Sequence, residues 1–172
     1  MRRRTVALLT LLLAAAFAGP ALALDHALAW QAKGVDGKLI RFDPQHLARP
    51  ALLLFWATWC PYCEALMPYL QKVYDAAGRD RLDVYAIDIK EDGDRDPVAT
   101  LRERKLTFTL VPDGDAIAEQ YAVKGTPGLF LIDTHGAIAY RRVGGDAPQK
   151  VEAALRAKLG LPAASAGAPV TH

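Results

Sequence analysis

The chain has 172 residues, of which 52% are hydrophobic and 23% are charged, and its formal net charge is +2. This length and apolar content predict one ordinary globular domain with a real core. Three arginines lie at the extreme N-terminus, and without them the formal charge is −1, which excludes the basic footprint of a nucleic-acid-binding protein.

The N-terminus has the layout of a secretory signal peptide. Basic residues Arg2 to Arg4 precede an apolar run from Val6 to Phe17, and small residues follow it up to Ala23. We therefore expect a signal peptide over residues 1–23, cleavage after Ala23 and a periplasmic location. An uncleaved membrane anchor is the alternative, but the run is shorter than the about 20 residues that span a bilayer, and Pro20 would break its helix.

Residues 24–50 are predicted to cover the domain as a hairpin. Short apolar segments at Leu28 to Trp30 and Leu39 to Phe42 flank the turn signal Asp36-Gly37. The unbroken apolar run from Ala51 to Trp56 then predicts a strand that is buried on both faces, at the centre of a sheet.

A helix is predicted after this strand, beginning near Cys60 and ending at Gly78. Pro61 suits its first turn, whereas Pro68 lies in its interior and should kink it. The apolar residues are spaced by three and four positions, which places them on one face. They are Cys63, Leu66, Met67, Leu70, Val73, Tyr74 and Ala77.

The middle of the chain alternates between predicted strands and helices. A strand over residues 82–89 precedes a helix capped by Asp96, with Pro97 as its first residue and its end near Lys105. A short strand is expected over residues 107–111 and a short helix over residues 115–121.

The last part predicts an antiparallel hairpin and a closing helix. Its strands cover residues 129–132 and 138–143, and the helix carries an apolar stripe of Val151, Ala154, Leu155 and Leu159. Residues 161–172, rich in alanine, proline and glycine, are predicted to be a disordered tail. The element order indicates one α/β domain over residues 24–160 with a sheet of mixed strand direction.

Cys60 and Cys63 are the only cysteines in the chain. At the start of a helix, free amides and the macrodipole stabilise a thiolate, so the pKa of Cys60 should fall. We expect its sulfur to be exposed and that of Cys63 to be shielded. A purely structural crosslink is the alternative, but a bond between residues three apart closes almost no loop.

A metal site is not indicated by the residues. Zinc takes four ligands, and no second half-site at a recognisable spacing accompanies the cysteines and the scattered histidines. We therefore expect no metal and no bound cofactor, with the Cys60–Cys63 disulfide as the redox group. The histidines are His26, His46, His135 and His172.

Three sequence features together resemble the thioredoxin superfamily: the string WATWCPYC, the helix proline Pro68, and the segment VKGTPGLFLID. Within it, the chain resembles exported TlpA-, ResA- and DsbE-type thiol-disulfide oxidoreductases, over residues 39–160. The resemblance implies an α/β thioredoxin-like fold, in which helices flank a central mixed β-sheet. It also implies an N-terminal β-hairpin and a central helix and strand insertion, matched by the segments near residues 97–105 and 107–111.

The resemblance assigns roles around the cysteines. Cys60 matches the attacking residue and Cys63 the resolving one. Trp59 matches the aromatic flank, and Pro61 and Tyr62 match the variable dipeptide, so these three residues are expected to contact substrate. The same dipeptide occurs in glutaredoxins, but a glutathione site cannot be inferred from two residues.

Thr126 and Pro127 match the family loop whose cis peptide bond faces the disulfide. Base rates alone favour a trans bond, since only about 5% of X-Pro bonds are cis. The resemblance implies the opposite, with the Thr126 backbone pairing strand to strand with an extended substrate segment.

Two positions depart from the family pattern. Leu54 stands where thioredoxins carry a buried aspartate, and Leu66 where ResA-like proteins carry a glutamate. The nearest acid, Glu64, is most simply a solvated residue that complements the helix dipole. Asp88 and Lys90 end a predicted strand near where substrate grooves often lie, but the sequence favours no functional role for them.

The resemblance implies an enzyme that reduces disulfides in client proteins, such as those of cytochrome c maturation or copper-site thiols. Protein thiols and disulfides would be its partners, a membrane protein would recharge it, and it would act as a monomer. A disulfide-donating oxidase remains open, because the redox direction depends on the reduction potential. So does a non-enzymatic chaperone that holds Cu(I) between Cys60 and Cys63.

Overall fold

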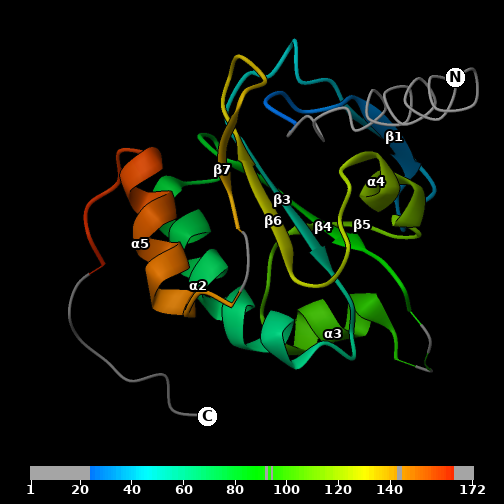
Figure 1. The fold of residues 1–172 in the computed structure, drawn as a ribbon. Coiled ribbons are helices and arrows are strands. Elements are labelled where there is room, and N and C mark those ends of the chain that lie inside the picture. The colour runs from blue at the N-terminus through cyan, green and yellow to red at the C-terminus, as the bar shows by residue number, and fades with distance from the viewer. Residues whose placement is uncertain (1–23, 92, 94, 143–144, 165–172) are drawn as a thin grey trace, which may run out of the picture.

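A five-stranded mixed sheet forms the centre of the molecule (Figure 1). The computed structural model describes residues 24–164 except 92, 94, 143 and 144. The predicted signal peptide and most of the predicted tail therefore lie outside the described residues. In spatial order the strands are β5 (Thr109–Val111), β4 (Asp83–Asp88), β3 (Ala51–Trp56), β6 (Gly128–Ile132) and β7 (Ile138–Arg141).

Strand β3 occupies the middle of this sheet, as its apolar sequence predicts. It pairs in parallel with β4 and antiparallel with β6, and every one of its residues is buried. Alternate side chains enter different cores, with Leu54 and Trp56 in one and Leu53 and Phe55 in the other. A strand covered on both faces needs the unbroken apolar run that the sequence provides.

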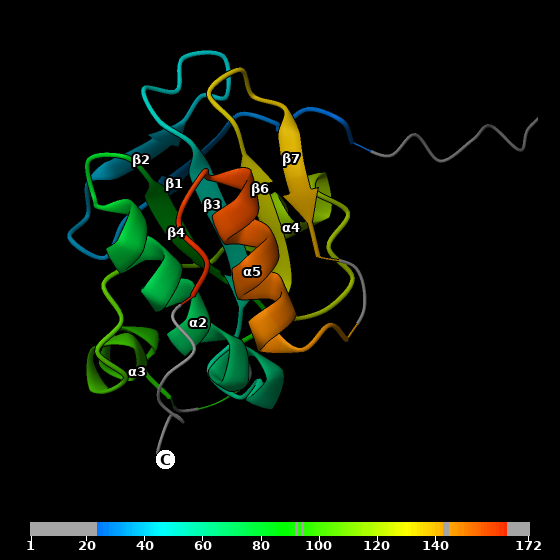
Figure 2. The ribbon, with the colours of Figure 1, turned by 90° about the vertical axis from the view of Figure 1, so that its left-hand side faces the viewer.

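Two layers cover the sheet (Figure 2). Helices α2 (Pro61–Ala77) and α5 (Pro148–Lys158) pack together on one face, where α3 (Pro97–Glu103) extends the same core. The opposite face is covered by α4 (Asp115–Gln120) and by the hairpin of β1 (Trp30–Lys33) and β2 (Leu39–Phe42). This is the mixed α/β arrangement that the sequence predicts, with its N-terminal hairpin and its helix and strand insertion.

Helix α2 follows its predicted pattern closely. The seven residues of the predicted stripe are its seven buried residues, and Pro61 is its first residue. Pro68 lies inside the helix, and Gly78 ends it with a φ of 87°, a conformation that suits glycine. Asp96 also caps α3 as predicted, because its carboxylate accepts a hydrogen bond of 2.8 Å from the amide of Val98.

Several element boundaries differ from those predicted. Strand β1 begins at Trp30 rather than Leu28, because the chain before it has other partners: Ala27 donates a hydrogen bond to Gly136 O, and Leu28 binds the hydroxyl of Tyr121. Strand β5 begins at Thr109 and α3 ends at Glu103, so both are shorter than predicted. Among the described residues, no helix has the length and apolar character needed to cross a membrane.

Candidate active site

The two cysteines form a disulfide at the first turn of α2. Cys60 is the N-cap residue, Cys63 lies within the helix, and their Cα atoms are 5.3 Å apart. Cys63 is completely buried and Cys60 is 3% exposed. The expectation that the Cys60 sulfur would be exposed is therefore wrong for the disulfide form, because its neighbours cover it as closely as they cover Cys63.

The start of α2 is a favourable place for negative charge on sulfur. The amide of Cys63 donates a hydrogen bond of 3.2 Å to Sγ of Cys60, so that this sulfur caps the helix. The macrodipole adds positive potential at the same point. Glu64, in the first turn, is exposed and forms an ion pair of 3.3 Å with Arg104, which ties α2 to the end of α3.

The segment before Cys60 is held by the loop that follows β4. Both the amide and the hydroxyl of Thr58 donate hydrogen bonds to the carboxylate of Glu91. The indole nitrogen of Trp59 donates to Lys90 O at 2.8 Å, and the guanidinium of Arg95 donates to Thr58 O at 3.3 Å. The position of the cysteine pair therefore depends on residues far along the sequence, which the motif itself does not reveal.

Two aromatic side chains lie exposed beside the disulfide. Trp59 is 45% exposed and Tyr62 is 72% exposed. Between them in the sequence lie the N-cap residue Cys60 and the first helical residue Pro61. Trp56 is fully buried, as the sequence predicts for a core residue. The exposed pair gives the site an apolar surface that a client protein could contact.

The Thr126–Pro127 loop precedes β6 and lies at the end of the sheet where β3 leads to Cys60. Its peptide bond is cis, as the family resemblance implies. Gly128, the next residue, pairs with Phe55 in the β3–β6 ladder, so the loop approaches the chain that leads from β3 to Cys60. Arg142 holds this loop through a hydrogen bond of 3.4 Å to Pro127 O.

The sequence did not predict that Asp88 would be buried. It ends β4 as the register partner of Trp56, and it is 6% exposed. Burial, followed by hydrogen bonding to Glu91 and the negative charges of that and other acids, raises the pKa of Asp88 to about 8. The sequence signal for its burial was its position within the apolar segment of residues 82–89, which predicts a strand.

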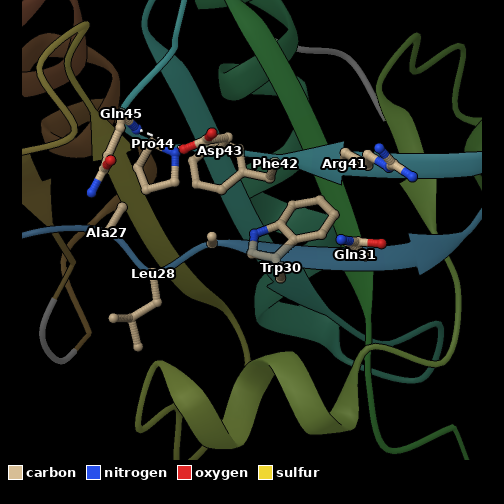
Figure 3. Close-up of a pocket in the computed structure, with 10 residues that line it drawn as sticks. Ala27, Leu28, Trp30, Gln31, Arg41, Phe42, Asp43, Pro44 and Gln45 are labelled. Atoms are coloured by element: carbon tan, nitrogen blue, oxygen red, sulfur yellow. Dashed lines mark hydrogen bonds between the residues drawn. The ribbon is translucent and has the colours of Figure 1, made fainter.

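A cavity of about 790 Å³ lies at the N-terminal hairpin, away from the cysteines (Figure 3). It is bounded by the stacked rings of Trp30 and Phe42, whose centroids are 5.3 Å apart. Neither cysteine lines this cavity, so it is not part of the cysteine site. Among the described residues, no group of three or more histidine, cysteine, aspartate or glutamate residues could hold a metal ion.

Comparisons with known proteins match the chain to one family model and to relatives that are named for thiol-disulfide chemistry. A model of the AhpC/TSA family matches residues 23–141. The chain is 31% identical to thiol-disulfide oxidoreductase ResA of Halalkalibacterium halodurans over 58% of its length and 57% of the relative's. It is 34% identical to thiol:disulfide interchange protein DsbE of Escherichia coli K12 over 63% of its length and 57% of the relative's. The match thus spans less than two thirds of either relative.

Solved structures share the fold. StoA of Bacillus subtilis superposes with a TM-score of 0.57 at 23% identity, covering 76% of this chain and 97% of that protein. A thiol:disulfide interchange protein from Bacteroides sp. gives a TM-score of 0.60 at 25% identity, covering 74% and 86% of the two chains. These superpositions confirm the predicted thioredoxin-like fold.

Proposed function

Because this chain belongs to the AhpC/TSA family, we propose that it is a thiol-disulfide oxidoreductase that reduces disulfide bonds in client proteins. The observation that carries the proposal is the Cys60–Cys63 disulfide at the amide-rich start of α2. That position favours a thiolate on the first cysteine and keeps the second within bonding reach. The names of the relatives, which describe thiol-disulfide oxidoreductases and interchange proteins, support the same reaction class.

The reaction is a pair of thiol-disulfide exchanges. The Cys60 thiolate attacks one sulfur of a client disulfide and expels the other as a thiolate, which leaves a mixed disulfide. Cys63 then loses its proton and attacks Sγ of Cys60, which releases the second client sulfur and closes the Cys60–Cys63 bond. The client gains two electrons and the enzyme dithiol loses them. No other cofactor takes part, because the cysteines carry both electrons.

The client would dock along the surface formed by Trp59, Tyr62 and the Thr126–Pro127 loop. The two aromatic rings offer exposed apolar area. The backbone of Thr126 would pair with an extended client segment. Main-chain hydrogen bonds of this kind do not depend on the identity of the client's side chains. Such a surface accepts clients of different sequence, provided that a disulfide lies in an extended segment.

The reducing direction is tested by equilibrating the protein with glutathione and dithiothreitol buffers of known potential. The fraction of reduced Cys60 and Cys63 is read by alkylation and mass measurement. A reductant should give a potential close to that of thioredoxin, about −270 mV, whereas a disulfide donor lies near about −120 mV. A value at the oxidising end would replace the proposed reductase with an oxidase.

Clients are identified by trapping. In Cys63→Ala the mixed disulfide cannot be resolved, so an attacked protein stays linked to Cys60. From the family resemblance we propose clients whose cysteines bind haem or copper. Cys60→Ala is the matched control, because it keeps one cysteine in α2 but lacks the attacking sulfur. Equal capture by both variants would show that the linkage is non-specific.

We also propose that the protein is exported from the cytoplasm, acts as a monomer and is recharged by a membrane redox partner. The N-terminal pattern up to Ala23 supports export, and exported compartments allow disulfides to persist. N-terminal sequencing of the mature protein from fractionated cells would test the placement. A chain that starts at Leu24 in the periplasmic fraction is expected, and an intact N-terminus in the membrane fraction would identify an uncleaved anchor.

A further inference from the structure

Among the described residues, the carboxyl group of Asp88 is buried at the end of β4 and has no ion-pair partner. The buried polar and charged residues among those described are Thr58, Asp88 and Glu152. Glu152 belongs to α5 and is paired with Arg156 at 2.8 Å. Asp88 has no such cation in the described part of the chain, where its Oδ1 atom is buried without a hydrogen-bond partner. Burying an ionised carboxyl group without a partner costs free energy, so such a group favours its protonated form.

Asp88 lies on the same side of the sheet as the two cysteines. Along β4, Val84 and Ala86 pack in the core that contains Cys60 and Cys63, while Ile87 packs in the core on the opposite face. Because side chains alternate along a strand, Asp88 continues the series of Val84 and Ala86. The strand pairing places it next to Trp56, which belongs to the cysteine-side core.

Glu91 connects this carboxyl group to the segment before the disulfide. Its carboxylate accepts the two hydrogen bonds from Thr58, and the amide of Cys60 donates a hydrogen bond of 3.2 Å to Ala57 O. The negative charge of Glu91 also raises the pKa of Asp88. The two acids therefore form a pair, defined here as the Asp88–Glu91 pair, that adjoins the turn into Cys60.

The charges around the pair favour its holding a proton. Glu91, Asp113 and Asp115 all add negative potential at Asp88. The neighbouring cations are engaged elsewhere, since Lys90 directs its ammonium to Lys124 O at 3.3 Å and Arg95 directs its guanidinium to Thr58 O. With burial as the largest cause, the pKa of Asp88 rises to about 8. This value is close to that of an ordinary thiol, about 8.5, which suits proton exchange between the two groups.

We propose that the Asp88–Glu91 pair exchanges a proton with Cys63 during the proposed thiol-disulfide reaction. When a reductant opens the Cys60–Cys63 bond, Cys63 leaves as a thiolate and receives the proton of Asp88. When a client's mixed disulfide is resolved, the Cys63 thiol returns that proton to the Asp88 carboxylate, attacks Sγ of Cys60 and expels the client thiolate. The pair is thus restored after each full cycle. Asp88 gives up and takes back this proton, while the sulfurs alone make and break the disulfide bonds.

The inference rests on the proposed function, and one experiment separates the two. Reduced protein is mixed rapidly with the chromogenic disulfide dithionitrobenzoate between about pH 5 and pH 9. Attack by Cys60 releases the first coloured thiolate, and attack by Cys63 on the mixed disulfide releases the second. We expect Asp88→Asn to slow the second release at least about tenfold near neutral pH and to leave the first release unchanged.

Glu91→Gln is an independent test, because it removes the charge that raises the pKa of Asp88 more than those of Asp113 and Asp115 do, but preserves the size of the side chain. The pH midpoint of the second release should then move to lower pH, since the pKa of Asp88 falls. A purely structural role would not move that midpoint. Glu119→Gln, an exposed residue of α4 on the opposite face of the sheet, is the matched control and should match wild type.

The possible outcomes separate the two hypotheses. A wild-type protein that releases only one thiolate would overturn the proposed function itself. A wild-type protein that releases both, together with Asp88→Asn and Glu91→Gln variants that share its rates and pH midpoint, would overturn the proton role alone. Circular dichroism of each variant establishes that it is folded, so a slow second release from a folded Asp88→Asn protein supports the proposal.

Discussion

The amide of Cys63 donates a hydrogen bond of 3.2 Å to the sulfur of Cys60, so the backbone of α2 at one cysteine orients the sulfur of the other. The bond places Sγ of Cys60 at the helix N-cap, where the macrodipole also acts. Reduction of the disulfide removes the covalent link between the sulfurs but does not remove the amide of Cys63. The same geometry can therefore stabilise the thiolate that begins each exchange.

The first prediction concerns the order of alkylation in the reduced protein. Iodoacetamide should modify Cys60 before Cys63, and at a pH at which an ordinary thiol, with a pKa of about 8.5, reacts slowly. Peptide mapping after short exposures across a pH series measures both rates. Cys63→Ala should keep the fast reaction of Cys60, whereas faster labelling of Cys63 than of Cys60 in wild type would contradict the N-cap argument.

A second prediction separates docking from chemistry at Trp59. Its ring is 45% exposed, and its indole nitrogen holds Lys90 O at 2.8 Å. Trp59→Ala should slow the reduction of a folded protein disulfide by about 10-fold, the loss of about 1.4 kcal/mol of contact free energy. The rate with a small disulfide should change less than twofold. Parallel assays with insulin and with dithionitrobenzoate measure the two rates, and equal losses with both would contradict a docking role.

Local patterns predicted the elements that local forces determine. The apolar spacing in α2 identified its seven buried residues, because a helix against a sheet must bury one face and the period is set by its geometry. The Asp96-Pro97 pair located the start of α3 for a similar reason, since a cap needs only the adjacent amides. The CxxC motif predicted the disulfide, because its two cysteines lie within the first turn of one helix.

Contacts between distant segments were beyond the local patterns. The hydrogen bonds from Thr58 to Glu91 join residues 33 positions apart, and neither residue carries a motif. The first apolar segment of the hairpin was predicted to begin at Leu28, but the chain before Trp30 binds the turn before β7, with His26 bridged to Ala137. The burial of Cys60 also depends on such tertiary packing. The relation of Asp88 to the cysteine side of the sheet is of the same kind, because only the pairing of β4 with β3 brings Asp88 beside Trp56.

A third prediction follows from the raised pKa of Asp88. In the unfolded chain this carboxyl group should titrate near about 3.9. Between that pH and about 8 the native state keeps a proton that the unfolded state has released, so the contribution of Asp88 to stability falls as pH rises through this range. Asp88→Asn should thus be more stable than wild type by about 1–3 kcal/mol at pH 8, and nearly equal to it at pH 4. Urea unfolding across this pH range checks the sign, and a constant difference would contradict it.

The fourth prediction concerns the buried ion pair of α5. Glu152 and Arg156 have side chains that are 5% and 12% exposed, and their atoms approach to 2.8 Å. Removing one partner leaves an uncompensated charge beside the core, so Arg156→Ala should lower the free energy of unfolding by about 3 kcal/mol. Urea unfolding measures the loss. Arg102→Ala, an exposed arginine of α3, is the control and should cost less than about 0.5 kcal/mol.

The last prediction tests how tightly Asp88 is enclosed. The amide of Gly114 donates a hydrogen bond of 2.7 Å to Asp88 O. A Cβ atom at Gly114 would clash with the side chain of Ile87 and approach Asp88 O to 2.9 Å. The φ of Gly114 is −82°, so the requirement for glycine is steric rather than conformational. Gly114→Ala should therefore destabilise the fold by about 1–3 kcal/mol and move the pH midpoint of the second exchange step, because it displaces the end of β4. Gly145→Ala, where a Cβ would meet no atom within 4 Å, is the matched control, and equal unfolding free energies for the two variants would contradict the close packing around Asp88.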